Sequence, residues 1–280
     1  MVRIIIDSTV DLPERIKKTL DVVPLTVVFG TEEYMDGVTI SPEEFYEKLV
    51  ETDVLPRTSQ AAPEAFKQAF ERVKAAGDSA VVITVSAALS GTYQSAQAAA
   101  EEYENIYVVD SQTAAIGSGI LTELALQWAG EGMDAREIAR NLEKERQNVC
   151  VIAMLDTLEY LQKGGRISKT AALAGTVLGI KPVLSIEHGH IQLLGKARGS
   201  KQANNLLAQE IEKAGGVNFE KPILLGYTGL SYRLLQKYIR DSAGLWQHGT
   251  NELRTAIISS VIGTHAGPGA VAAAFFKKNV

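Results

Sequence analysis

The sequence has little of what disulfide-bonded or membrane-spanning proteins need. Cys150 is the only cysteine of the 280 residues, so no intrachain disulfide can form, and a reducing compartment is expected. It lies in the apolar run 149–153, which predicts a buried strand and an inert thiol. No apolar run approaches the roughly 18 residues of a transmembrane helix, and the segment from Met1 to Asp7 lacks a signal-peptide core. We therefore expect a cytoplasmic protein.

The sequence also lacks a basic stretch and a set of metal ligands. The formal net charge is -5 and the pI is near 5.5, which argues against nucleic acid as a partner. His188 and His190 stand close together, but they lie at a predicted polar turn with no cysteine near. The sequence thus predicts no metal site.

Apolar, β-rich runs alternate with amphipathic helical stretches through the first half of the chain. This alternation is typical of βαβ units and predicts an α/β fold with a Rossmann-like, mostly parallel sheet. We expect strands at residues 3–6, 22–29, 80–85 and 106–109, and helices at 13–20, 61–76, 92–102, 117–128 and after a capping box at 41–44.

The pattern changes near Asp156 to shorter strands and glycine turns. We expect a boundary there, between an N-terminal α/β domain of residues 1–155 and a C-terminal α+β domain of residues 156–280. In the second domain we expect two strands in 182–194 around the His188–His190 turn, strands at 223–227 and 256–262, and helices at 200–214, 232–239 and 269–277.

Four short segments combine a hydroxyl or a histidine with glycine or glutamine. Small polar donors, on backbone that glycine allows to approach closely, suit an anionic head group. If the fold gathers these segments, the chain should bind a small ligand with one negative end. The segments are 57–60, 89–94, 164–168 and 263–267.

Other chemistries fit the sequence less well. A serine hydrolase could use Ser90 and His265, but the first glycine of the G-x-S-x-G turn is missing, and the acid would have to be distant, such as Asp7 or Asp110. Residues 117–119 lack the third glycine of a dinucleotide site, and residues 175–181 have the wrong glycine spacing for a phosphate loop. We therefore expect no ATP site in this chain.

Five segments together resemble the DegV family, in order and over essentially the whole length. The resemblance implies a bacterial fatty-acid-binding protein, in some members the binding subunit of a two-component fatty acid kinase. It also implies two α/β domains with one long-chain fatty acid between them. The segments are 4–12, 58–60, 89–96, 161–168 and 264–269.

The resemblance also implies roles for single residues. Thr58, Ser90 and His265 would hold the fatty-acid carboxylate, and Arg166 and Arg198 would contact the kinase or the arriving phosphate. Alanine at position 62, where many members have serine, leaves the Thr58 assignment intact.

The expected protein is therefore a lipid-binding protein and not an enzyme. Its ligand would be an acid such as palmitate or stearate, with no cofactor, and transient membrane contact is compatible with this role. A separate kinase catalytic subunit would supply ATP and form the acyl phosphate. A fatty acid carrier or sensor without a kinase, and the hydrolase of an acyl substrate, stay open. The sequence gives neither the acyl chain length nor the oligomeric state.

Overall fold

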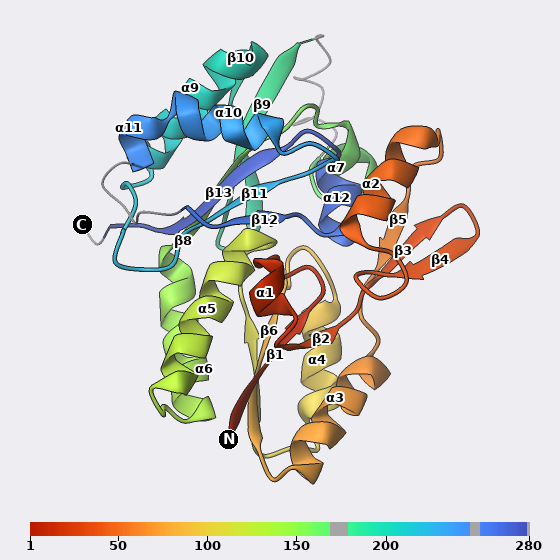
Figure 1. Ribbon diagram of the computed structural model, residues 1–280. Coiled ribbons are helices and arrows are strands. Elements are labelled where there is room, and N and C mark those ends of the chain that lie inside the picture. Colours follow the sequence, from red (N-terminus) through yellow and green to blue (C-terminus); the bar gives the residue numbers. More distant parts are fainter. Residues whose placement is uncertain (169–178, 247–252, 279–280) are drawn as a thin grey trace.

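The computed structural model describes residues 1–168, 179–246 and 253–278. Within these residues the strands form three sheets, and two of them stack along the long axis of the molecule in Figure 1. Most of the segment 175–181, considered above as a phosphate loop, lies outside the described residues.

The first sheet is parallel and has the strand order β2-β1-β6-β7. Helices α3 and α4 cover one face and helices α5 and α6 the other, as Figure 1 shows. This is the Rossmann-like arrangement that the alternating sequence predicts. The elements are β1 (Val2–Asp7), β2 (Asp21–Val23), β6 (Ser79–Thr84), β7 (Ile106–Asp110), α3 (Pro63–Ala75), α4 (Thr92–Ala100), α5 (Ile116–Gly130) and α6 (Ala135–Glu145).

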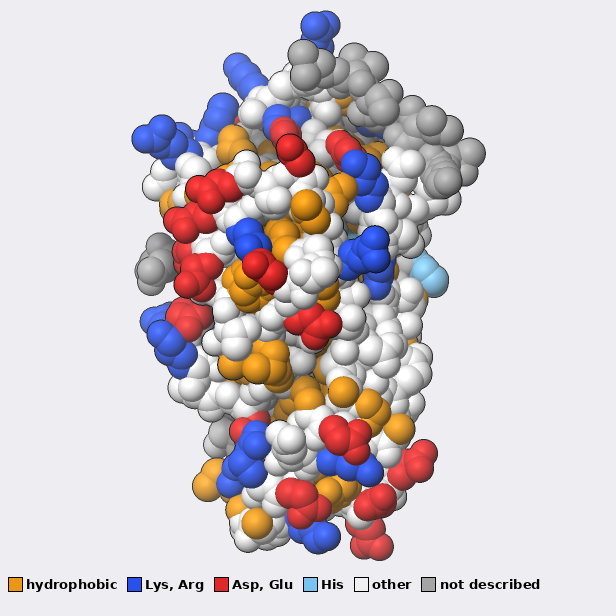
Figure 2. All heavy atoms as spheres, turned by 90° about the vertical axis from the view of Figure 1, so that its right-hand side faces the viewer, with side chains coloured by type: hydrophobic (Ala, Val, Ile, Leu, Met, Phe, Trp, Pro, Cys, Tyr) orange, Lys and Arg blue, Asp and Glu red, His pale blue; other side chains and the backbone are white. Residues whose placement is uncertain are grey.

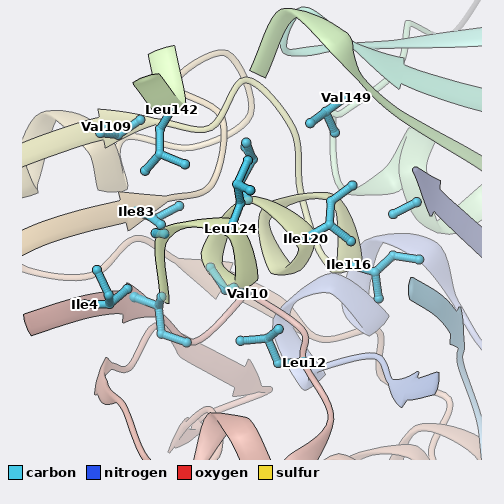
Figure 3. Packing of buried hydrophobic residues seen from close by; sticks show 14 of the residues in the cluster. Ile4, Val10, Leu12, Ile83, Val109, Ile116, Ile120, Leu124, Leu142 and Val149 are labelled. Atoms are coloured by element: carbon cyan, nitrogen blue, oxygen red, sulfur yellow. The ribbon is translucent and has the colours of Figure 1, made fainter. Parts of the chain in front are cut away.

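Helix α5 is buried because it packs against both large sheets. Its residues Ile116, Ile120 and Leu124 recur every fourth position and so lie along one side of the helix. Figure 3 shows them in one cluster with Ile83 of the first sheet and Val149 of the second. The helix therefore ties the two halves of the molecule into one core.

The second sheet is mixed and has the order β10-β9-β8-β13-β11-β12. Helices α9, α10 and α11 cover its outer face, above the sheet in Figure 1. Its inner face is turned toward the first sheet. The elements are β8 (Val149–Met154), β9 (Ile180–Glu187), β10 (His190–Arg198), β11 (Leu224–Tyr227), β12 (Thr255–Ile257), β13 (Val271–Phe276), α9 (Gly199–Lys213), α10 (Arg233–Asp241) and α11 (Ala243–Trp246).

Strand β8 precedes the boundary expected near Asp156, yet it pairs with β9 and β13 of the second sheet. A division drawn between the two sheets falls before Val149. Cys150 is fully buried on this strand, as expected. Burial and the neighbouring Glu187 raise the pKa of its thiol.

The third sheet is small and antiparallel and has the order β4-β3-β5. Its strand β5 carries Thr58 of the predicted polar segment. The expected single strand at 22–29 is wrong: Pro24 lies between β2 and β3, which belong to different sheets. The capping box at Ser41 and Glu44 is confirmed at the start of α2. The elements are β3 (Thr26–Phe29), β4 (Glu32–Met35), β5 (Arg57–Ser59), α2 (Pro42–Glu51) and the short helices α1 (Glu14–Lys17), η1 (Arg146–Asn148) and α7 (Glu159–Lys163).

Two expectations for the C-terminal region are wrong. The segment expected as a helix at 269–277 forms β13, which is hydrogen-bonded on both sides, to β8 and β11. Its alanine run favours a helix by local propensity, but pairing in the centre of a sheet outweighs that preference. The strand expected at 256–262 ends at Ile257, and helix α12 (Ser260–Ala266) follows.

The face shown in Figure 2 carries acidic and basic side chains interspersed, with apolar side chains between them. This face has no broad basic patch. Among the helices of the described ranges, none combines the length and the apolar character of a membrane span.

Candidate functional site

An apolar cavity lies between the two large sheets. The inner face of the second sheet lines one side through Val151, Leu184 and Ala272, and the loops after β1 and β6 line the other through Thr9 and Val85. The cavity holds about 940 Å³ of empty space, its open mouth included.

Alanine side chains create much of this space. Ala153 of β8 and Ala272 of β13 are cross-strand partners on the sheet face that lines the cavity. Small side chains there leave a hollow where leucine or valine would fill the gap between the sheets. Further alanines line the same cavity, namely Ala114, Ala115, Ala266 and Ala270.

The polar residues gather at one end of the cavity, contributed by three separate parts of the chain. Thr58 lies on β5, Ser90 in the loop between β6 and α4, and His265 near the end of α12. The Thr58 hydroxyl and Nε2 of His265 are 2.9 Å apart and hydrogen-bonded. The Ser90 hydroxyl is hydrogen-bonded to the Thr92 hydroxyl at 2.9 Å. The fold thus brings together all three residues expected at the carboxylate.

Two glycines of the predicted segments allow this close packing. A Cβ atom on Gly164 would lie 2.2 Å from Nδ1 of His265, and one on Gly91 would lie 2.0 Å from Oε1 of Gln60. Both distances are shorter than van der Waals contact. At Gly164 the backbone can approach the His265 ring this closely because it lacks a side chain, whereas the neighbour at Gly91 is the flexible end of the Gln60 side chain.

Arg166 also lines the polar end of the cavity. Its guanidinium donates from Nε and Nη2 to the carbonyl of Leu89, at 3.2 and 3.1 Å, and from Nη1 to the carbonyl of Gly164, at 2.6 Å. Burial lowers the pKa of Arg166. A fixed positive charge therefore stands next to Ser90. Arg198 does not join it: it is exposed at the N-cap of α9 and does not line this cavity.

Burial, together with the nearby charge of Arg166, lowers the pKa of His265 from 6.5 to about 4. The imidazole is therefore neutral at pH 7. Its Nδ1 is buried and has no hydrogen-bond partner within the described residues. A bound anion at this end would offset the charge of Arg166 and favour the imidazolium.

The hydrogen bonds of a serine-hydrolase triad are not formed. Ser90 is bonded to Thr92, and no hydrogen bond joins it to His265 in the described part of the chain. Asp7 accepts hydrogen bonds from the backbone of Thr9 and Val85. Asp110 accepts hydrogen bonds from the backbone of Ala87 and Gln112. Both carboxylates therefore stabilise the loops that follow the strands of the first sheet. Nucleophile, base and acid therefore do not form the chain that the triad requires.

Across residues 1–168, 179–246 and 253–278, no three side chains of the metal-ligating types are grouped to hold a metal ion. His188 and His190 lie at the β9–β10 turn, as expected.

Sequence reasoning missed most of the apolar wall. The sequence does not predict that Ala270 and Ala272 line a cavity, because the segment 269–277 is expected to be a helix and alanine alone does not indicate a strand. Thr92 lies in the predicted polar segment 89–94, but the sequence does not indicate its contacts: its hydroxyl accepts from the Ala61 backbone and so joins the segment after β5 to Ser90. Leu184 and Ile186 were detectable, because alternation in 182–194 places them on one face.

Comparisons with known proteins agree over the whole length. A family model described as "Uncharacterised protein, DegV family" matches residues 1–278. A DegV domain-containing protein of Caldanaerobacter subterraneus is 33% identical over 293 residues, covering 99% of each chain. A DegV family protein of Thermus thermophilus, described for its fatty acid binding, is 31% identical with a TM-score of 0.87, covering 98% of this chain and 99% of that one. A stearic acid-binding protein of Eubacterium ventriosum is 26% identical with a TM-score of 0.88, covering 99% of both chains.

Proposed function

The chain belongs to the DegV family, and from that premise and the geometry of the cavity we propose that it binds one long-chain fatty acid. The observation that carries the proposal is a largely apolar cavity in whose wall Thr58, Ser90, Arg166 and His265 are gathered. Two relatives support it: the Thermus thermophilus protein binds fatty acid, and the Eubacterium ventriosum protein binds stearic acid.

The carboxylate lies at the polar end, between Thr58, Ser90 and His265, with Arg166 behind it. A buried carboxylate is costly unless it accepts hydrogen bonds, and these groups supply donors. Each head-group hydrogen bond contributes about 1 to 3 kcal/mol. The roughly 14 methylenes of a palmitate-like tail contribute about 0.8 kcal/mol each before the losses of ordering and association. The tail therefore sets the affinity and the head group sets the orientation.

The head group lies at the end of the cavity nearer to solvent. Ser59 and Gln60 line the cavity and are exposed, whereas Val151 and Leu184, which line the apolar part, are buried. A fatty acid bound in this direction presents its carboxylate outward. This is the orientation that a second protein needs to reach a carboxylate oxygen.

The second protein in this proposal is a separate kinase that supplies ATP and converts the bound acid into an acyl phosphate. Transfer requires the carboxylate oxygen in line with the γ-phosphate, which a fixed orientation provides. Arg166 offsets charge as the phosphate arrives, and the exposed Arg198 contacts the kinase. A chain that binds fatty acid but gives no acyl phosphate with any such kinase acts instead as a carrier or sensor.

The binding proposal is tested with a fatty acid and its methyl ester, which share the tail but not the charge. We expect wild-type protein to prefer the acid by about tenfold or more, as the loss of a charge-assisted hydrogen bond implies. Thr58→Val, which keeps the side-chain shape, should reduce that preference. Equal affinity for acid and ester would show that the polar end does not recognise a carboxylate.

A further inference from the structure

Two buried carboxylates hold the start of the helix that carries His265. Oδ1 of Asp11 accepts a hydrogen bond from the backbone N–H of Ser259 at 3.0 Å, and Oδ1 of Asp36 accepts one from Ser260 at 3.1 Å. The two aspartates are 1% and 2% exposed. They lie more than 200 residues before the helix in the sequence, so these bonds join α12 to the N-terminal half of the chain.

The second oxygen of each carboxylate forms no hydrogen bond within the described residues, although serine hydroxyls stand beside both groups: that of Ser259 lowers the pKa of Asp11, and those of Ser260 and Ser8 lower the pKa of Asp36. Oδ2 of Asp11 and Oδ2 of Asp36 are buried and form no hydrogen bond within the described residues, and the hydroxyls of Ser259 and Ser260 are in the same condition. Two carboxylates that bond to successive backbone N–H groups lie close together. In such a pair, the charge of one carboxylate disfavours ionisation of the other unless a proton or a cation lies between them.

In the described part of the chain a single cation faces the two carboxylates, so it offsets only part of their negative charge. Lys17 of α1 is the nearest cation, with its Nζ 3.8 Å from Oδ1 of Asp11, and it donates to the carbonyl of Ser8 at 2.9 Å. Tyr46 of α2 faces the pair but donates its hydroxyl to the carbonyl of Ile258. Glu14 of α1 lines the same surface groove as Asp11 and adds negative charge.

We propose that Asp11 and Asp36 are positioning residues of the fatty-acid site, and that one of the two carries a proton while they hold α12. Helix α12 places Val261, Ile262 and His265 in the cavity wall. Protonation removes the repulsion between the carboxylates and supplies a donor for an unpartnered oxygen. The site is therefore held more firmly when the pair carries its proton. The role in ligand binding rests on the proposed function, whereas the shared proton does not.

The titration behaviour agrees with this geometry. Burial raises the pKa of Asp11 from 3.8 to about 7, and the charge of Asp36 adds to the effect while Lys17 opposes it. Burial likewise raises the pKa of Asp36. A carboxyl group whose pKa is higher in the folded than in the unfolded state makes the folded protein less stable as the pH rises from the unfolded pKa to the folded pKa.

The first test compares the unfolding of lipid-free wild type and Asp11→Asn at pH 5.5 and pH 8. Asparagine accepts from Ser259 as aspartate does but cannot ionise. We expect the ratio of the two folding constants, wild type over variant, to be roughly 30-fold larger at pH 5.5 than at pH 8, as follows from a pKa of about 7 against 3.8. The comparison cancels the titration of His265, which both proteins share. A ratio that does not change with pH would overturn the shared proton.

Glu14→Gln is the matched control, because Glu14 lines the same groove but is 69% exposed. The ratio of the folding constants of wild type and Glu14→Gln should be the same at pH 5.5 and at pH 8. An equally large change in this variant would mean that the effect is not particular to the buried pair.

The second test measures the affinity of both proteins for a fluorescent long-chain fatty acid at the same two pH values. We expect the affinity of wild type, relative to Asp11→Asn, to fall severalfold from pH 5.5 to pH 8, since the titration of the ligand is common to both. If the unfolding ratio changes with pH but the affinity ratio does not, the pair does not position the site. If neither protein binds the probe at either pH, the proposed function fails, and the unfolding test still decides whether the proton is shared.

Discussion

Ala272 should limit the length of the acyl tail that the cavity accepts. Ala272→Leu places three further carbon atoms on the sheet face beside Ala153, where the cavity is lined by small side chains. Displacing about three tail methylenes costs about 0.8 kcal/mol each, or about 2.4 kcal/mol in total. That corresponds to roughly a 50-fold weaker Kd for a fatty acid that fills the cavity.

A shorter acid leaves this space unused, so the effect of the substitution depends on chain length. We expect a large loss of affinity for 18-carbon acid and little change for 12-carbon acid, measured by titration calorimetry over a series of saturated acids. Ala98→Leu is the matched control, since Ala98 is exposed on α4 and does not line the cavity. An equal loss at every chain length, or no loss at all, would refute the placement of the tail against β8 and β13.

Further predictions concern the polar end. Ser90→Ala should keep the fold but weaken fatty acid binding by about 1 to 3 kcal/mol, and unchanged affinity in a fluorescence titration would contradict its role. The pKa of His265, about 4 in the ligand-free protein, should rise when a carboxylate binds, and NMR titration of free and loaded protein checks the sign. Gly164→Ala should displace His265 and reduce affinity, whereas Gly130→Ala, with open space at its Cβ, should not. Arg166→Ala should slow acyl phosphate formation by a kinase that accepts the wild-type protein; an unchanged rate argues against its role.

Where one physical signal dominates, the sequence predicts the structure well. The capping box at Ser41 and Glu44 appears as expected, because two reciprocal hydrogen bonds make it a local feature. The strands β1, β6 and β7 are predicted because each is a short apolar run between helical stretches. Helix α6 was not predicted, although Asp134 caps it and it packs its apolar face against the first sheet.

The failures arise where long-range packing decides. Ala272, Ala273 and Ala274 have helical propensity, but the neighbouring strands β8 and β11 supply backbone hydrogen bonds on both sides. The segments that carry Thr58, Ser90 and His265 are visible in the chain as glycine and hydroxyl clusters, but the choice of these three residues follows from the DegV resemblance, and their role stays a prediction. The cavity beside them could not be predicted, because it arises from alanines on two strands that are more than 100 residues apart.

Mass spectrometry of the organic extract from freshly purified protein, with the extracted lipid quantified against protein, tests directly whether the cavity holds a fatty acid. We expect about one long-chain fatty acid per chain, and markedly less from Ser90→Ala purified in the same way. An extract with no lipid, or one whose bound molecule lacks a carboxylate, would show that this cavity does not hold a fatty acid by its carboxylate.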